Sequence, residues 1–257
     1  MTRVIINGYL GKLGRSICEL IESGEGGDCH VAAGIDIADN TKGAYFPTYK
    51  DISECDMPAD VIIDCSLPDV TLKALEYACA KNTPLLICTT ALSPELLVKI
   101  DEASSKIAVF RSANMALGVN MVQNLLQKAS KLLFDSGFDV EIIEKHHNQK
   151  LDAPSGTAMM FADTINSAVG GNLEYVYGRS PEKKAAREKA ELGMHAVRGG
   201  TITGEHSIIF AGKDETIEIS HIAFSRKVFA VGAVRAAMFL AGKPAGKYDM
   251  NAMLNEE

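Results

Sequence analysis

The first 110 residues alternate short apolar runs with stretches in which apolar side chains recur at helical spacing. Residues 3–7 form an apolar run that ends at a glycine, and apolar side chains from Leu13 to Ile21 then fall on one face of a helix. Further strands are expected at residues 30–36, 59–65, 84–88 and 107–110, and further helices at 69–81 and from Ser93 onward. Repeated strand–helix–strand units predict a parallel sheet with helices on both faces.

From Gly118 the pattern changes. We expect a long helix over residues 118–133, a strand over 139–146, a helix from Ser155, and antiparallel strands at 193–198, 204–211 and 215–223, where apolar and polar residues alternate. Helical spacing over residues 229–240 predicts a last helix that can return to the first domain. The fold class is therefore α/β, with a parallel-sheet domain of residues 1–117 plus 227–257 and an α+β domain of residues 118–226.

Composition narrows the class of protein. The chain has 26 lysine and arginine residues against 33 aspartate and glutamate residues, and this net charge of −7 argues against a nucleic-acid partner. No apolar run reaches the roughly 18 residues that a membrane-spanning helix needs, so we expect no membrane partner. The six cysteines all precede residue 90 and none forms a Cys-x-x-Cys pair, which favours reduced thiols in a cytoplasmic protein over disulfides or a structural zinc.

Three glycines, Gly8, Gly11 and Gly14, follow the first predicted strand and open the first predicted helix. Such a turn allows the backbone to approach a pyrophosphate at a helix N-terminus. Asp36 ends the second strand, where a carboxylate can accept hydrogen bonds from ribose hydroxyls. Together they predict a dinucleotide site, and the alternative is a tight turn beside a surface aspartate. Because residues 37–41 contain no Arg or Lys for a 2′-phosphate, we predict that NADH is preferred over NADPH.

A second polar cluster spans residues 144–158. By themselves, the adjacent His146 and His147 together with Lys150 fit a metal site or a solvated loop as well as a reactive site. The segment Ser155–Thr157 adds a capping hydroxyl and exposed backbone N–H groups at a helix start, which is an anion-binding arrangement. No carboxylate–histidine spacing of a known zinc type surrounds the pair. We therefore predict a small anionic substrate with a proton donor beside it, and no metal.

At this cluster the sequence resembles the family of dihydrodipicolinate reductase, also called 4-hydroxy-tetrahydrodipicolinate reductase, of lysine and diaminopimelate biosynthesis. The resemblance covers nearly the whole chain and includes Gly8–Gly14, Asp60–Ser66, Thr89-Thr90, Ser112–Asn114, Gly118–Asn120, Glu144–Ala158, Arg198–Gly200, Gly204–His206, Ser225-Arg226, Gly232–Arg235 and Tyr248–Met250. It implies a Rossmann-like, dinucleotide-binding first domain, a second domain for substrate binding and oligomerisation, and a homotetramer assembled through the sheets of the second domains.

The resemblance also implies residue roles. His146 matches the family's proton donor and acceptor, and Lys150 its second catalytic proton donor. The substrate-binding residues would be His147, Gly156, Thr157 and Arg226. The cofactor-binding residues would be Gly8, Tyr9, Leu10, Gly11, Lys12, Leu13 and Asp36 on the pyrophosphate and ribose side, and Cys88, Thr89, Thr90, Ser112, Ala113, Asn114 and Met115 on the nicotinamide side.

The implied reaction is the NAD(P)H-dependent reduction of 4-hydroxy-tetrahydrodipicolinate, a small dicarboxylate heterocycle, to tetrahydrodipicolinate. Hydride passes to C4 of the ring, a proton passes to the adjacent carbon, and the 4-hydroxyl leaves as water. Three departures from the family pattern stand near the implied sites. Ala91 replaces a usual glycine, Ala116 replaces a common serine, and Asn148-Gln149 replace a frequent Arg-His pair.

Two other functions stay open on the residues alone: another two-domain NAD-dependent dehydrogenase, or a non-catalytic module that senses NAD. A semialdehyde dehydrogenase needs a nucleophilic cysteine in its second half, and this chain has none there. The intact His146 and Lys150 argue against a sensor. We interpret His195, His206 and His221 as structural, and the charged stretch 182–191 as a solvated surface segment.

Overall fold

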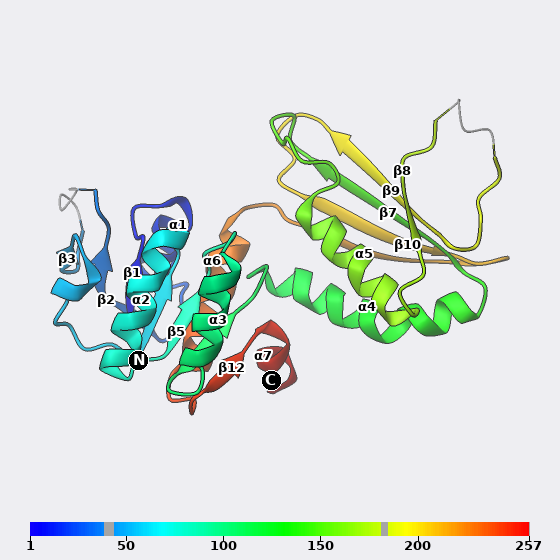
Figure 1. Cartoon of the computed structure of the whole chain (residues 1–257). Helices are drawn as coiled ribbons and strands as arrows, with labels where there is room; N and C mark the ends of the chain where they lie inside the picture. Colours follow the sequence, from blue (N-terminus) through cyan, green and yellow to red (C-terminus); the bar gives the residue numbers. More distant parts are fainter. Residues whose placement is uncertain (39–43, 181–184, 257) are drawn as a thin grey trace. The chain divides into compact units, whose positions relative to one another are not determined.

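The computed structural model describes residues 1–38, 44–180 and 185–256 (Figure 1). The chain divides into two compact units, one made of Met1–Leu117 and Lys227–Glu257 and the other of Gly118–Arg226. The chain thus leaves the first unit once and returns to it with its last helices.

The first unit is built on a seven-stranded sheet in which all neighbouring strands run parallel. In spatial order the strands are β12 (Gly246–Tyr248), β6 (Ala108–Arg111), β5 (Leu85–Ile87), β4 (Val61–Asp64), β1 (Thr2–Asn7), β2 (Cys29–Ile35) and β3 (Thr48–Tyr49). This is the doubly wound order of a Rossmann-like fold. With the mixed sheet of the second unit, it confirms the predicted α/β class.

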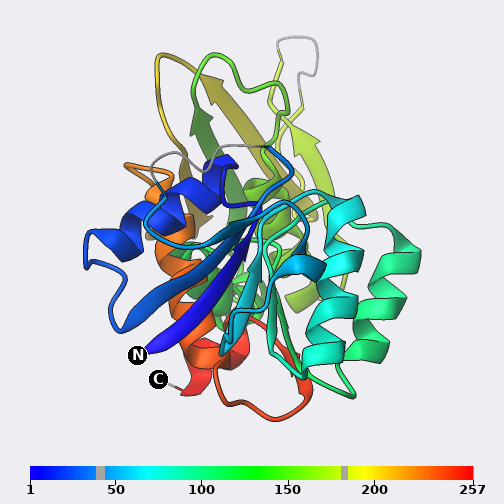
Figure 2. The ribbon, with the colours of Figure 1, turned by 90° about the vertical axis from the view of Figure 1, so that its left-hand side faces the viewer.

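Helices cover both faces of this sheet. Their bounds are α1 (Lys12–Glu22), α2 (Pro68–Lys81), α3 (Pro94–Ala103), α6 (Lys227–Leu240) and α7 (Met250–Glu256), and a short 3₁₀ turn lies at Ile52–Glu54. Val4 and Ile6 of β1 pack in one core cluster with α1 and α6, whereas Ile5 packs with α2 and α3. Figure 2 shows α1 in blue and α6 in orange on one side of the strands, and the cyan and teal α2 and α3 on the other.

Local sequence signals set several helix ends. The Ser93 hydroxyl accepts a hydrogen bond from the Leu96 N–H at 3.2 Å, and Pro94 follows as the first helical residue of α3. A cap of this kind contributes about 1 kcal/mol to stability. At the C-terminal end of α2, Asn82 adopts the left-handed conformation with φ 52°, which terminates that helix.

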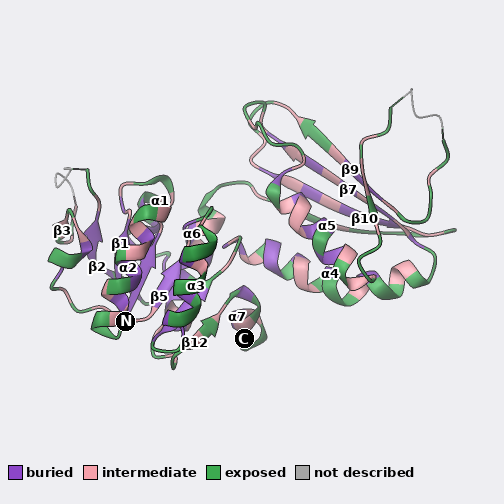
Figure 3. Ribbon diagram, viewed as in Figure 1, coloured by how far each residue is buried: buried purple, intermediate pink, exposed green. Residues whose placement is uncertain are grey.

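The second unit is a five-stranded sheet with two helices. Its strands in spatial order are β11 (Thr216–Ile222), β10 (Glu205–Ala211), β7 (Asp139–His146), β9 (Glu191–Arg198) and β8 (Glu174–Tyr177), and its helices are α4 (Leu117–Asp135) and α5 (Gly156–Ala168). Alternate residues of β7, including Val140 and Ile142, are buried on the face that packs against α5 (Figure 3). We call this the inner face. The outer face carries the partly exposed Asp139, Glu141 and Lys145.

One predicted strand pairing is wrong. The strand at residues 193–198 was expected to be antiparallel, but β9 runs parallel to both β7 and β8. The antiparallel prediction holds for β10, which pairs with β7 and β11. Alternation of apolar and polar residues reports only that one face of a strand is buried, so it does not reveal the direction of the neighbouring strand.

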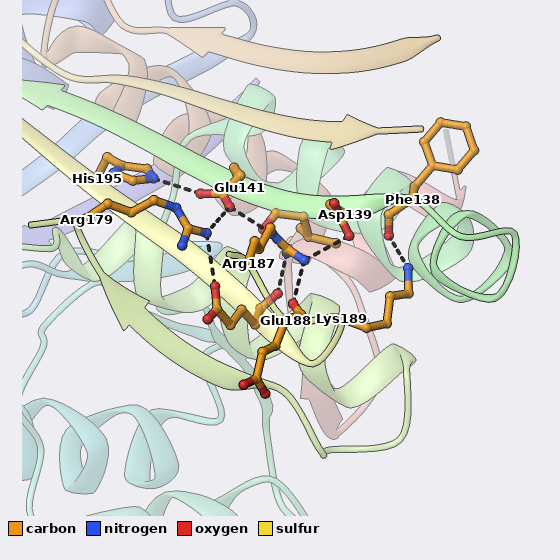
Figure 4. A network of polar contacts seen from close by, with 10 residues as sticks. Phe138, Asp139, Glu141, Arg179, Arg187, Glu188, Lys189 and His195 are labelled. Atoms are coloured by element: carbon orange, nitrogen blue, oxygen red, sulfur yellow. Dashed lines mark hydrogen bonds and ion pairs between the residues drawn. The ribbon is translucent and has the colours of Figure 1, made fainter. Parts of the chain in front are cut away.

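The charged segment before β9 lies on the surface as predicted, with residues 185, 186 and 188–190 exposed, but it makes contacts with the sheet that the prediction did not include. Residues 181–184 lie outside the described residues, but Arg187 donates hydrogen bonds to Asp139 at 2.8 Å and to Glu141 at 3.0 Å. Lys189 donates to the backbone carbonyl of Phe138 at 2.7 Å (Figure 4). Carboxylates on the outer face of β7 therefore hold the described part of this segment against the sheet.

The six cysteines are free thiols, and all of them lie in the first unit. Within the described ranges, no helix combines the length and the apolar composition needed to cross a membrane. The same residues include no group of three or more His, Cys, Asp or Glu side chains arranged to hold a metal ion.

Candidate active site

The glycine turn after β1 is fixed by contacts that exclude side chains. Gly8 has φ +85°, and a Cβ on it would lie 2.7 Å from the carbonyl oxygen of Cys65. A Cβ on Gly14 would lie 2.2 Å from the carbonyl oxygen of Gly8. The Gly11 N–H donates to the same Gly8 oxygen at 3.0 Å and closes the turn. Alanine at Gly8 or Gly14 would therefore displace the backbone that opens α1.

This turn leaves the N-terminus of α1 suited to an anion. Gly11 is the N-cap and supplies no side-chain hydrogen bond, and the first turn of α1 contains no acidic residue. Asp36 follows β2 and accepts hydrogen bonds from the Leu10 N–H at 3.2 Å and the Ala38 N–H at 3.0 Å. Free N–H groups at a helix start beside a strand-end carboxylate fit the pyrophosphate and ribose of a dinucleotide.

A cavity of about 250 Å³ lies at this turn, lined by Gly8, Gly11, Asp36 and Ser66 among others. Two lysines that the sequence analysis did not single out, Lys50 and Lys73, also line it. Lys73 forms an ion pair with Asp51 at 2.6 Å. Tyr9, by contrast, is buried edge-to-face against Phe46, and its backbone N–H donates to the carbonyl of Ile35 at 3.3 Å, so its ring does not face the cavity.

A buried carboxylate organises the strand ends next to the turn. Asp64, at the end of β4, is fully buried and accepts hydrogen bonds from Asn7 at 2.8 Å, Thr71 at 2.6 Å, Thr89 at 2.9 Å and Ser66 at 2.5 Å. Thr89 is one of the predicted nicotinamide-side residues, and its hydroxyl is used in this contact. Asp64 therefore fixes where the loop after β5 begins.

The rest of that loop is more accessible. Thr90 is exposed, Cys88 is partly buried, and burial raises the pKa of the Cys88 thiol. Ala91 adopts φ +56°, the left-handed conformation that glycine takes at less cost. The departure from the family glycine at this position thus places a methyl group on a strained backbone.

The segment after β6 is held by hydrogen bonds between its own residues. The Ser112 hydroxyl donates to the carbonyl of Asn114 at 2.9 Å, and the Asn114 side chain accepts from the N–H of Ala116 at 2.9 Å. Ala113 is exposed between them. Met115 is buried in the core cluster, so its side chain is directed away from any ligand on the surface.

In the second unit, His146 is held by a carboxylate. Its Nδ1 atom lies 2.6 Å from Glu144 Oε2, and both side chains are on the inner face of β7. Arg198, the register partner of His146 on β9, donates to both oxygens of Glu144 at 2.8 and 2.7 Å. Burial raises the pKa of Glu144, but the hydrogen bonds from Arg198 and His146 outweigh it, so this pKa lies below its ordinary value.

His206 connects this group to the start of α5. Its Nε2 atom lies 2.9 Å from the Ser155 hydroxyl, which also caps α5 by accepting from the Ala158 N–H. The rings of His206 and His146 lie edge-to-face with their centroids 5.2 Å apart. Burial is the main cause that lowers the pKa of His206 to about 4, and the nearby His146 adds to it.

The His206 shift predicts a pH dependence of stability. An unfolded chain protonates His206 as the pH falls below 6.5, whereas the folded chain resists protonation until about pH 4. The contribution of neutral His206 to the free energy of unfolding is therefore fully present above pH 6.5. It falls by about 3 kcal/mol as the pH is lowered to 4. Urea unfolding of the wild type and of His206→Gln should show their difference in unfolding free energy narrowing over this range. A constant difference would contradict the prediction.

Lys150 and the N-terminus of α5 both contact one side-chain carboxylate, that of Asp152. The Lys150 Nζ atom lies 2.8 Å from Asp152, and the backbone N–H of Gly156 donates to the same side chain. These contacts, with Lys150 the largest cause, lower the pKa of Asp152. The cation and the helix start are thus arranged around one carboxylate, the chemical group that the predicted substrate carries.

A cleft of about 530 Å³ borders this region. His147 and Arg226 both line it, and the Arg226 guanidinium lies 3.5 Å from His147 Nε2. The other lining residues are Asn148, Gln149, Gly200, Thr201, Thr203, Phe224 and Ser225. Gly204 follows Thr203, and a Cβ on it would lie 3.1 Å from His146 Nε2. The structure thus places His147 and Arg226 together in the cleft. His146 does not line it, but its ring lies against Gly204, the residue after Thr203. Gly156 lines a separate hollow with residues of α4 and α5.

Sequence reasoning missed three residues of this group: Glu144, Arg198 and His206. Glu144 stands two positions before His146, and this spacing places both on one face of a strand, so it was a usable signal. The contacts of Arg198 and His206 follow from strand register between distant segments. That register has no local mark in the sequence.

Comparisons with known proteins cover both units. The family model "Dihydrodipicolinate reductase, N-terminus" matches residues 2–115, and the model "Dihydrodipicolinate reductase, C-terminus" matches residues 118–254. The 4-hydroxy-tetrahydrodipicolinate reductase of Clostridium tetani (strain Massachusetts / E88) is 47% identical over 255 residues, which is 99% of this chain and 98% of that protein. The protein of the same name from Caldanaerobacter subterraneus subsp. tengcongensis is 47% identical over 256 residues, with 100% and 99% covered.

A solved structure shares the fold. The structure of dipicolinate-bound dihydrodipicolinate reductase from Paenisporosarcina sp. TG-14 has a TM-score of 0.78 and 24% sequence identity, and the match covers 98% of this chain and 99% of that one.

Proposed function

The chain belongs to the dihydrodipicolinate reductase family, and from this membership we propose that it reduces 4-hydroxy-tetrahydrodipicolinate to tetrahydrodipicolinate with NAD(P)H. One hydride and one proton are consumed and one water leaves. The resemblance drawn from the motifs is confirmed, and the chain is an oxidoreductase of lysine and diaminopimelate biosynthesis. The two rival functions, another dehydrogenase and an NAD sensor, lose their support with this membership.

One arrangement carries the assignment of the reaction to particular residues. An acid–base group, His146, stands with its ring fixed by Glu144, next to a cleft that His147 and Arg226 line with basic side chains. A small dicarboxylate needs cationic and N–H donors for its two carboxylates, and a reduction at carbon needs a proton source near them. Both requirements are met within one unit of the chain.

The proposed mechanism assigns one task to each residue. His147, Arg226, Thr157 and the N-terminus of α5 bind the substrate carboxylates. His146 Nε2 delivers a proton to the carbon next to C4. Lys150 supplies positive charge and gives a second proton to the leaving 4-hydroxyl; because the carbon next to C4 loses one of its own protons when this water leaves, the net consumption is one proton. The dinucleotide, when bound, supplies the hydride. On the first unit, the glycine turn and the start of α1 would hold its pyrophosphate, and the loops after β5 and β6 would bind its nicotinamide side.

NADH is the proposed preferred cofactor, with NADPH as the second. The carboxylate of Asp36 is held by the Leu10 and Ala38 N–H groups at the cavity of the glycine turn, where a 2′-phosphate would meet its negative charge. Ala38 is described, whereas residues 39–41 of the segment without Arg or Lys lie outside the described part of the chain.

Asp36→Ala should raise the KM for NADH by about 10-fold to 100-fold, because hydrogen bonds to a charged group contribute about 1.5–3 kcal/mol. The KM for NADPH should rise less or fall, since the repulsion of its phosphate is removed. Steady-state kinetics with each cofactor measure both values. Asp28→Ala, at the exposed other end of β2, is the control. Equal or better kcat/KM with NADPH in the wild type would overturn the preference.

A homotetramer in the cytoplasm is the proposed state of the enzyme. Val197, Lys145, Glu205 and Ile222 form a row across four strands on the outer face of the second sheet, and Val197 and Ile222 are exposed there. Exposed apolar side chains on a sheet face, here on either side of the Lys145–Glu205 ion pair, favour assembly with another copy. The free thiols fit a reducing compartment. Light scattering that gives the mass of one or two chains would exclude the tetramer.

A coupled assay tests the function. Freshly made product of dihydrodipicolinate synthase is added to the full chain, and the loss of NADH absorbance is followed. Turnover is expected. No turnover with cofactor binding intact would favour the sensor, and turnover only with other carbonyl compounds would favour another dehydrogenase. Dipicolinate, the ligand of the Paenisporosarcina structure, is expected to bind and to inhibit.

A further inference from the structure

Glu144 is a buried carboxylate whose two oxygens are fully used. Glu144 is 1% exposed. Oε2 lies 2.6 Å from His146 Nδ1 and accepts from one nitrogen of Arg198 at 2.8 Å. Oε1 accepts from the other nitrogen of Arg198 at 2.7 Å and from the backbone N–H of Ser155 at 3.0 Å. Three segments, β7, β9 and the start of α5, thus meet at one side chain.

An ionised Glu144 at this buried position costs free energy of folding. Val140 and Ile142, two and four positions earlier on the same face of β7, are fully buried apolar side chains. Removing a carboxylate and a guanidinium from water costs several kcal/mol per ion, and apolar side chains of similar volume at such sites are often as stable or more so. The Glu144 carboxylate is buried with both oxygens hydrogen-bonded, whereas Arg198 is partly buried and its Nε atom has no partner among the described residues. A costly carboxylate kept in this place next to His146 is therefore one whose position matters for the chemistry.

The contact determines which nitrogen of His146 can exchange a proton. Because Glu144 is an acceptor, Nδ1 carries a hydrogen, and Nε2 is the atom left to gain and release the proton. The negative carboxylate stabilises the imidazolium form. The bond from the Ser155 N–H also ties the N-cap of α5 to the same carboxylate, which fixes the distance between the proton donor and the helix start that would bind substrate.

We propose that Glu144, held by Arg198, is the positioning residue of the reaction: it fixes the tautomer and orientation of His146 and connects that ring to the N-terminus of α5. This proposal rests on the proposed role of His146 as proton donor. The other charged or titratable groups around Glu144 and His146 include His206 on β10, Lys150 and Asp152 on the loop after β7, and Arg198 on β9.

Glu144→Gln removes the charge and keeps the shape. We expect kcat to fall by about 10-fold to 100-fold, less than on loss of the acid itself, with the KM for NADH unchanged. In the profile of kcat/KM against pH, the descending limb should move to lower pH, because the imidazolium loses its carboxylate partner. Glu144→Asp, which keeps the charge, should restore part of this shift.

The chain offers a matched control on the outer face of the same strand. Glu141 also accepts hydrogen bonds from a histidine, His195 at 2.7 Å, and from two arginines, Arg179 at 2.9 Å and Arg187 at 3.0 Å (Figure 4). Glu141→Gln therefore removes a glutamate charge with the same kinds of partner from a partly exposed position on the same strand. It should lower thermal stability comparably and leave the pH profile unchanged.

The outcomes separate this proposal from the proposed function. A wild-type pH profile and kcat in Glu144→Gln, with His146→Gln strongly impaired, overturns the positioning role alone. Unimpaired turnover in His146→Gln overturns the proton-donor role on which it depends. If Glu144→Gln does not fold, NMR of isotope-labelled histidine in the wild type decides: a neutral His146 protonated at Nδ1 supports the proposal, and one protonated at Nε2 overturns it.

Discussion

Replacement of His146 by glutamine is expected to lower kcat by about two to four orders of magnitude, the usual contribution of a positioned general acid. Glutamine retains a hydrogen-bonding side chain of similar reach but releases no proton at neutral pH. The KM for NADH should stay close to the wild-type value, because the glycine turn and Asp36 belong to the other compact unit. Steady-state kinetics in the coupled assay, with each reactant varied in turn, measure both quantities.

The control for this variant is the same substitution at His195. That histidine also donates to a glutamate of β7, Glu141, but on the outer face of the sheet. His195→Gln should reduce stability without reducing kcat. A near-wild-type kcat in the His146 variant would remove that residue from the proton-transfer step and direct attention to Lys150.

Where a local signal exists, the sequence predicts the fold closely. The strand at residues 139–146 has the predicted bounds, although its buried face includes the polar Glu144 and His146 besides Val140 and Ile142. The helices at Pro94 and Gly156 begin where serine caps predict, since Ser93 and Ser155 both accept a hydrogen bond from the first turn. The short edge strands β3 and β12, of two and three residues, have too few positions to show any periodicity, and they were missed.

The same difference between local and long-range signals applies to the candidate site. Gly8, Gly14 and Asp36 stand in one stretch of chain, so their spacing predicts a turn whose need for glycine the structure explains. Their role toward a cofactor stays a prediction. The other groups around Glu144 and His146 come from β9, β10 and the start of α5, and only the pairing of distant strands brings Arg198 and His206 to them. The anchoring of Arg187 was missed for the same reason, because its carboxylate partners are more than 40 residues away in sequence.

Loss of Lys150 is expected to affect both turnover and binding. Lys150→Met removes the cation that faces Asp152 at 2.8 Å. The uncompensated Asp152 carboxylate, next to the Gly156 N–H, would then repel a dicarboxylate at the α5 N-terminus. We expect kcat to fall about 100-fold and the Kd for dipicolinate to rise about 10-fold or more, the effect of one charge-assisted hydrogen bond. Calorimetric titration with dipicolinate measures binding independently of turnover.

Two further variants separate charge from proton transfer. Lys145→Met removes a lysine of β7 that pairs with Glu205 at 3.0 Å on the outer face, so it makes the same change of net charge away from the cleft and should leave dipicolinate binding unchanged. Lys150→Arg keeps the positive charge on a group that does not release its proton near neutral pH. It should bind dipicolinate almost as well as the wild type while kcat stays low. If Lys150→Arg instead recovers full turnover, Lys150 acts through its charge alone, and His146 is left as the single proposed proton donor.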